Sequence, residues 1–162
     1  MAVTRSSFRP ASVNVMVNAE LRTLHAADGT PVCNVSFDLS AQQLHAAARA
    51  AEAIRLERHR HQALSTDDVL ALRELTGLSD ELHQLADHGA HATVVLPLAR
   101  FVALHDALVE WVHAAEDRGW MREEDQEIHP LVAALIDPMA SLREEALHAV
   151  LGENAPAADH NA

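Results

Sequence analysis

The segment "CNVSFDLSAQQLHAAARAA", Cys33–Ala51, changes its hydrophobic period from two to nearly four at its middle. In its first half, apolar and polar side chains alternate, which is typical of a half-buried strand. The apolar positions of this strand are Cys33, Val35, Phe37 and Leu39. Ser40, followed three residues later by Gln43, matches the capping box that begins a helix. The segment therefore predicts a strand that runs directly into a helix, which we expect to extend from about Ala41 to His61.

A second alternating segment lies upstream, from Val13 to Leu21. The turn signal Asp28-Gly29 separates it from the strand at Cys33–Leu39, so the two segments predict a β-hairpin. Further along the chain, "ATVVLP", Ala92–Pro97, is β-branched and closed by proline, which is consistent with a third short strand.

The remainder of the chain has helical spacing, and its start and stop signals divide it into several helices. Ser65 and Ser79 are candidate helix starts, and Gly119 is a candidate stop. Pro130 and Pro138 each predict the first turn of a new helix. We expect an α+β, helix-dominated fold in which an N-terminal β-hairpin, with a third short strand as an option, packs against five or six helices. The expected organisation is a flexible arm at 1–11, a single domain at 12–152 and a disordered tail at 153–162.

The composition argues against several classes of partner. The formal net charge is −12, which disfavours binding to nucleic acid or to anionic lipid, because both depend on clustered Lys and Arg. We see no apolar segment long enough to span a membrane and no secretion signal. The single cysteine, Cys33, excludes an intramolecular disulfide and is typical of a reducing compartment. These features predict a cytoplasmic protein.

A cationic cluster stands at the expected end of the first helix. It consists of Arg58, His59, Arg60 and His61. On a helix, His59 and His61 point in nearly opposite directions and cannot chelate one ion. Positive side chains in the last turn of a helix stabilise its exposed carbonyl groups. Stabilisation of the helix end is the leading interpretation of this cluster. The alternative is a partner-binding surface for an acidic peptide or a phosphate.

A histidine-rich segment, "SDELHQLADHGAH", follows at Ser79–His91. It contains His83, His88 and His91, which together with nearby aspartates could ligate zinc or nickel. His83 and His88 would converge only if the chain reversed at Gly89. Surface histidines without a ligand are the alternative.

The segment "LRELTGLSDELHQL", Leu72–Leu85, resembles the helix-turn-helix pattern of bacterial regulators. The resemblance implies a pair of short helices joined at the "TGLS" turn. The second helix, which would be the recognition helix of such a motif, carries Asp80 and Glu81 but no Arg or Lys. It therefore lacks the side chains that usually donate hydrogen bonds to bases. We therefore expect an αα-hairpin used for packing and no nucleic-acid partner.

The predicted helix faces do not bring polar side chains together at one place, as a catalytic site would require. The sequence therefore favours a non-enzymatic interaction or regulatory protein that acts through a surface. A hairpin leaves unpaired strand edges, which predicts a homodimer with the strands or the alanine-faced helices at its interface and allows a further protein partner. Alternatives are a histidine-based metal-binding protein or small metalloenzyme, an acidic protein that mimics nucleic acid or binds a basic partner, and an enzyme whose site forms between two subunits. No cofactor is predicted apart from the zinc or nickel alternative.

Overall fold

The structure is a computed structural model that describes residues 2–5, 19–25, 31–60 and 65–154, with side chains described for 33–60 and 65–151. Its described elements are β1 (Ala2–Arg5), β2 (Ala19–His25), β3 (Pro31–Ser40), α1 (Ala41–Arg60), α2 (Thr66–Leu75), α3 (Leu78–Ala86), β4 (His91–Pro97), α4 (Leu98–Arg118) and α5 (Glu123–Asn154). The fold is α+β and helix-dominated, as the sequence predicts.

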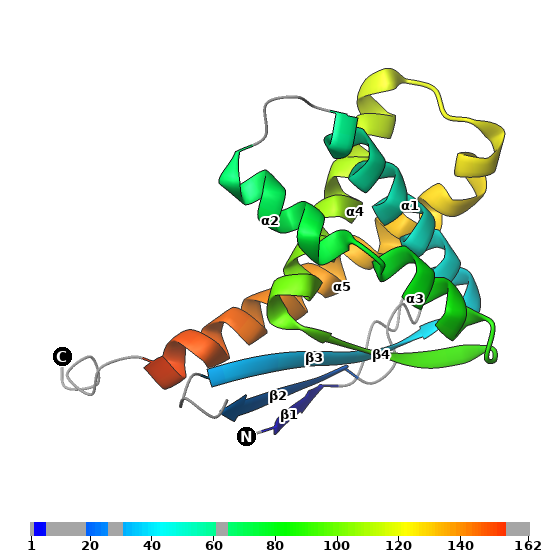
Figure 1. The fold of residues 1–162 in the computed structure, drawn as a ribbon. Coiled ribbons are helices and arrows are strands. Elements are labelled where there is room, and N and C mark those ends of the chain that lie inside the picture. The colour runs from blue at the N-terminus through cyan, green and yellow to red at the C-terminus, as the bar shows by residue number, and fades with distance from the viewer. Residues whose placement is uncertain (1, 6–18, 26–30, 61–64, 155–162) are drawn as a thin grey trace.

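The strands form one antiparallel sheet in the order β1-β2-β3-β4 (Figure 1). β3 pairs with β4 so that Val35 lies opposite Leu96 and Phe37 opposite Val94. The predicted third strand at Ala92–Pro97 is thereby confirmed. β3 and β4 do not form a hairpin, because α1, α2 and α3 lie between them in the sequence.

β2 pairs with β3 in an antiparallel register that places Leu21 opposite Val35. The predicted Asp28-Gly29 turn and residues 13–18 of the predicted first strand lie outside the described residues, so the hairpin turn stays a prediction. Ala2–Arg5, within the predicted arm at 1–11, form β1 and pair with β2. Residues 6–11 and 155–162 also lie outside the described residues.

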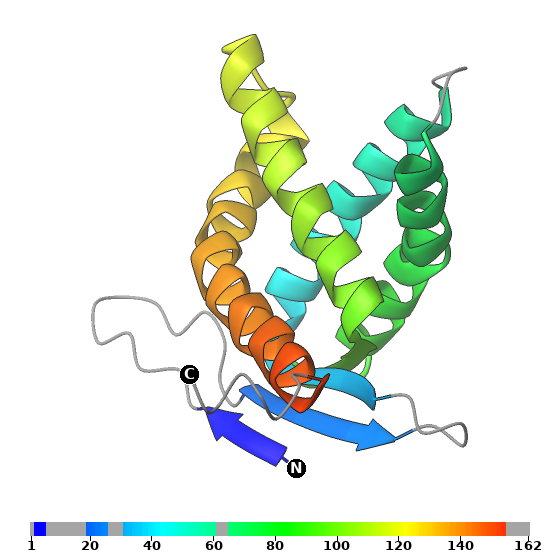
Figure 2. The same ribbon diagram turned by 90° about the vertical axis from the view of Figure 1, so that its left-hand side faces the viewer.

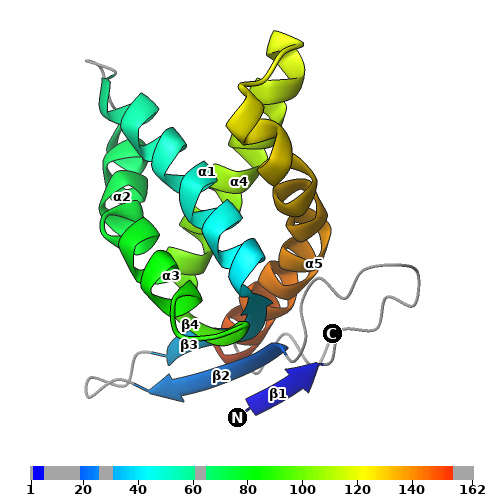
Figure 3. The ribbon, with the colours of Figure 1, turned by 90° about the vertical axis from the view of Figure 1, so that its right-hand side faces the viewer.

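The helices lie over one face of the sheet, and they spread apart with distance from it (Figures 2 and 3). The inward-facing side chains of β3, from Cys33 to Leu39, are buried as the alternation predicts. Phe37 meets Phe101 of α4 edge to face, with ring centroids 5.5 Å apart and an interplanar angle of 75°. This contact joins the sheet to the helical layer.

The capping box predicted at the start of α1 is present. The backbone N–H of Ser40 donates to Oε1 of Gln43 over 2.8 Å, and the backbone N–H of Gln43 donates to Oγ of Ser40 over 3.1 Å. The helix that follows buries an alanine face within the chain. These buried alanines are Ala46, Ala47, Ala48, Ala50 and Ala51. Small side chains allow α1 to pack closely against its neighbours.

α2 and α3 form the predicted αα-hairpin, which turns at Gly77 with φ 78° in the left-handed region. Arg100 of α4 secures this turn, because its guanidinium donates to the carbonyl oxygens of Glu74 and Thr76 over 3.1 and 3.3 Å. The same guanidinium lies 2.6 Å from Glu81. The helix-turn-helix segment thus packs against α4 in this chain.

The prediction that Pro130 and Pro138 begin separate helices is wrong, because α5 continues through both. Each proline removes one backbone hydrogen bond and bends the helix. The apolar face of α5 nevertheless stays in register across Pro138. Its buried members are Val132, Leu135, Met139, Leu142 and Ala146. Burial of this face outweighs the lost hydrogen bonds. Among the described residues, no helix combines the length and the apolar composition needed to cross a membrane.

Candidate functional site

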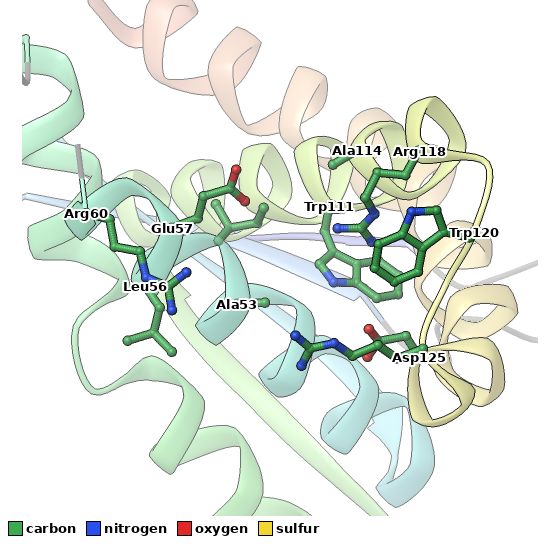
Figure 4. Close-up of a pocket in the computed structure, with 11 residues that line it drawn as sticks. Ala53, Leu56, Glu57, Arg60, Trp111, Ala114, Arg118, Trp120 and Asp125 are labelled. Atoms are coloured by element: carbon green, nitrogen blue, oxygen red, sulfur yellow. The ribbon is translucent and has the colours of Figure 1, made fainter.

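A hollow of about 410 Å³ lies between the C-terminal half of α1, the end of α4 and the start of α5, where these helices spread apart on the side away from the sheet (Figure 4). We call it the tryptophan hollow. It is lined by Ala53, Ile54, Leu56, Glu57, Arg60, Trp111, Ala114, Arg118, Trp120, Arg122 and Asp125. On α1 and α4 the lining residues recur at three- and four-residue intervals, so each of these two helices contributes one face.

Two indole rings form one side of the hollow. Trp111 is only 6% exposed and its ring centroid lies 5.9 Å from that of His129, whereas Trp120 is 60% exposed. Trp120 follows Gly119, which ends α4 in the left-handed conformation with φ 74°. This turn redirects the chain, and Figure 4 shows Trp120 on the same side of the hollow as Trp111. Both tryptophans of the protein therefore line one site.

Three arginines line the same hollow. Among the described side chains outside the hollow, every guanidinium group except that of Arg73 is paired with a carboxylate, and these paired residues are Arg49, Arg55, Arg58, Arg100 and Arg143. Among the described side chains, Arg60, Arg73, Arg118 and Arg122 form no ion pair, and three of these four line the tryptophan hollow. In a chain with net charge −12, this concentration of unneutralised guanidinium is unexpected for a solvated surface.

Two carboxylates also line the hollow, and one of them is paired with an arginine that it shares with a third carboxylate. Asp125 accepts from Nε of Arg49 over 3.2 Å, and the same guanidinium lies 3.1 Å from Glu124. Glu57 is exposed at the rim. The guanidinium of Arg118 lies over the ring of Trp120, with 5.1 Å between Cζ and the ring centroid. The guanidinium donors suit an anionic ligand, and the ring of Trp120 holds one of these guanidinium groups by a cation–π contact.

The predicted partner-binding cluster is divided by the structure. Arg58 points to α4, where its Nε and Nη2 lie 3.2 and 2.5 Å from Oε2 of Glu110. His59 is exposed, and His61 lies outside the described residues. Only Arg60 lines the tryptophan hollow. Its cationic neighbours there are Arg118 and Arg122, which the sequence does not place beside it.

The predicted metal ligands His83, His88 and His91 are not brought together. His83 instead contacts His45 of α1, with 2.7 Å between their Nδ1 atoms, and His45 Nε2 lies 3.9 Å from Asp87. His88 Nδ1 contacts a backbone carbonyl one turn earlier, and His91 is exposed at the start of β4. Within the described part of the chain, no three His, Cys, Asp or Glu side chains are placed to hold a metal ion.

One histidine is buried between α4 and α5. His105 Nε2 lies 3.2 Å from the carbonyl oxygen of Ile136, and its Nδ1 lies 3.1 Å from Nη1 of Arg143. A carbonyl only accepts and a guanidinium only donates, so the hydrogen bonds require a neutral ring protonated at Nε2. Burial lowers the pKa of His105 below 6.5, and the charge of Arg143 adds to this effect.

Helical periodicity could not identify the hollow, because Trp111 falls on the apolar face of its helix and reads as a core residue. Arg60 and Arg118 are also far apart in the sequence. A local signal did exist in "DRGWMR", Asp117–Arg122, where a tryptophan stands between two arginines directly after a helix-ending glycine. Comparison of the chain with protein-family models, curated proteins and solved structures found no match.

Proposed function

We propose that the protein is a non-enzymatic cytoplasmic binding protein that captures an anionic ligand in the tryptophan hollow. The observation that carries the proposal is the convergence of Arg60, Arg118 and Arg122, all without an ion pair among the described side chains, on one hollow. Guanidinium groups recognise carboxylates and phosphates through paired N–H donors. A regulatory role would follow from the presence or absence of this ligand.

The lining supplies recognition groups. Guanidinium and indole groups orient and retain a ligand, whereas general acid or base catalysis requires a titratable group that is free to exchange a proton near neutral pH. Of the lining carboxylates, Asp125 is held by Arg49. The shape agrees with a binding site as well, since ligand pockets commonly enclose about 300–1,000 Å³.

Quenching of tryptophan fluorescence tests the proposal directly, because both tryptophans line the hollow. With each quencher scaled to its effect on free N-acetyltryptophanamide, iodide should quench more strongly than caesium in the wild-type protein, despite the net charge of −12, because three arginines that form no ion pair among the described side chains line the same hollow as the tryptophans. Inorganic phosphate should reduce iodide quenching more than potassium fluoride does at equal ionic strength.

The variant R60A/R118A/R122A should reverse the preference, so that caesium quenches at least as strongly as iodide. R73A is the matched control, because Arg73 is exposed on α2 and also forms no ion pair among the described side chains. R73A should keep the wild-type preference. A wild-type protein that caesium quenches as strongly as iodide would contradict the proposal.

We also propose that the protein is a homodimer that pairs through β4. The alanine face of α1 is buried within the chain, which leaves the strands as the more suitable interface. β4 is an edge of the described sheet, and Val95 on its outer face is 58% exposed. An exposed edge of this kind readily pairs with a second chain.

Size-exclusion chromatography with light scattering should give twice the 17.6 kDa chain mass at micromolar concentration. V95K should shift the equilibrium toward monomer, whereas V69K, on the exposed side of α2, should not. A monomeric wild-type protein would contradict the dimer.

A further inference from the structure

We infer that the ligand of the tryptophan hollow is a planar aromatic ring that carries a carboxylate or phosphate group. The inference rests on the anion-binding function proposed above, and it adds the ring and its position. Three arginines alone could bind an anion of any shape. Both tryptophans of the chain also line the same hollow, which favours a ligand with an aromatic ring.

The two indole rings have different surroundings. Trp111 is buried and packs against His129, so its orientation is fixed by the α4–α5 contact. Most of the surface of Trp120 is exposed to solvent, although large aromatic side chains are usually buried in folded proteins. A planar ring placed against Trp120 would cover this surface and gain the favourable geometry of aromatic stacking.

Arg118 links the ring to the charge. Its guanidinium lies over the face of Trp120 at 5.1 Å. A stacked guanidinium presents one face to the ring and keeps its N–H donors at the edge of its plane, where they can bind a carboxylate or phosphate in bidentate fashion. A ligand that joins a ring to an anionic group can therefore contact Trp120 and Arg118 together.

The remaining cations lie around the same space. Arg60 comes from the last turn of α1 and Arg122 directly precedes α5, so guanidinium groups line the hollow on both of its walls. Asp125 does not oppose this placement, because Arg49 holds its carboxylate. A volume of about 410 Å³ accommodates one or two fused rings with their anionic substituent.

Isothermal titration calorimetry with matched small molecules tests the inference. The probes are 2-naphthoate and 2-naphthyl phosphate, which distinguish a carboxylate from a phosphate on the same ring. Inorganic phosphate lacks the ring, decahydro-2-naphthoate lacks planarity, and 2-naphthalenemethanol lacks charge. Of 2-naphthoate and 2-naphthyl phosphate, the compound that binds more tightly should bind at least about tenfold more strongly than each of the three comparison compounds. Each comparison compound lacks either the stacking contact or the charge-assisted contact.

Variants assign the two contacts. W120A should weaken the naphthyl anions by about tenfold and leave inorganic phosphate unchanged, whereas R118A should weaken both. L147A is the control, because Leu147 is an exposed apolar residue of α5 that does not line the hollow. Trp120 and Leu147 are both exposed, so neither truncation should prevent folding.

The inference and the proposed function fail in different ways. If decahydro-2-naphthoate binds as tightly as 2-naphthoate, or if W120A binds naphthyl anions as well as the wild type does, the aromatic ligand is wrong. The anion-binding function would survive that result, provided that iodide quenches more strongly than caesium. Loss of the iodide preference would remove both.

Discussion

Arg143 of α5 donates a hydrogen bond to Nδ1 of His105 over 3.1 Å, and this contact fixes a neutral imidazole in the α4–α5 interface. The same guanidinium lies 2.6 Å from the carboxylate of Asp106, so its charge is compensated. A proton added to Nδ1 would turn the acceptor into a donor that faces another donor. The interface therefore depends on the protonation state of one ring.

The free energy of unfolding should fall as the pH drops below 6.5, the reference value for the unfolded histidine. The unfolded chain takes up a proton at that pH, whereas the folded chain does so only at lower pH because the pKa of His105 is lowered. H105Q should flatten this part of the profile, since glutamine can donate to Ile136 and accept from Arg143. Urea unfolding between pH 5 and pH 8 measures the effect. H113Q, an exposed site on the same helix, should keep the wild-type slope.

Truncating Phe101 should lower the free energy of unfolding by about 3–5 kcal/mol, because F101A removes a fully buried ring and leaves a cavity against Phe37. V69A, on the exposed side of α2, should change it by less than about 0.5 kcal/mol. Chemical denaturation followed by circular dichroism measures both. A cost for F101A no larger than that for V69A would show that the two rings do not join the layers.

The capping box at Ser40 should stabilise the whole fold. S40A should lower the free energy of unfolding by about 0.5–2 kcal/mol, because α1 is central to the core. The same motif occurs at Ser65, where α2 buries only Leu75. We expect S65A to act locally, and hydrogen exchange should show faster exchange in α2 with little change in global stability. Equal global effects would contradict this difference between the two helices.

Replacing Gly119 should destabilise the turn before Trp120. G119A should lower the free energy of unfolding by about 1 kcal/mol, because alanine is strained at φ 74° even though an added Cβ meets nothing within 4 Å. G89A is the matched control, since Gly89 does not have a positive φ. It should be neutral or slightly stabilising. Thermal unfolding of the two variants side by side decides the point.

Much of the fold was predictable from local pattern. The alternation at Cys33–Leu39 and the Ser40–Gln43 box specify the strand and the helix start through interactions within a few residues. Gly119 likewise marks the end of α4 as predicted. The path of α5 was not predictable, because the burial of its face depends on α1, α4 and the sheet, which a local reading of Pro130 and Pro138 does not include.

The candidate site was predictable only in part. Arg60 was identified within a cationic cluster, but its neighbour Arg58 pairs with Glu110 of another helix. The hollow forms only when α1 and α4 pack, so residues that are far apart in the sequence become one lining. His83 illustrates the same point, since its contact is His45 on α1.

The two prolines of α5 also affect how the molecule acquires its shape. A straight helix of 32 residues would be about 48 Å long. Pyrrolidine rings favour curvature through clashes with the preceding turn. Packing against α1, α4 and the sheet then selects the arc of α5, whose first turn pairs with Arg49 of α1 and which also contacts β3.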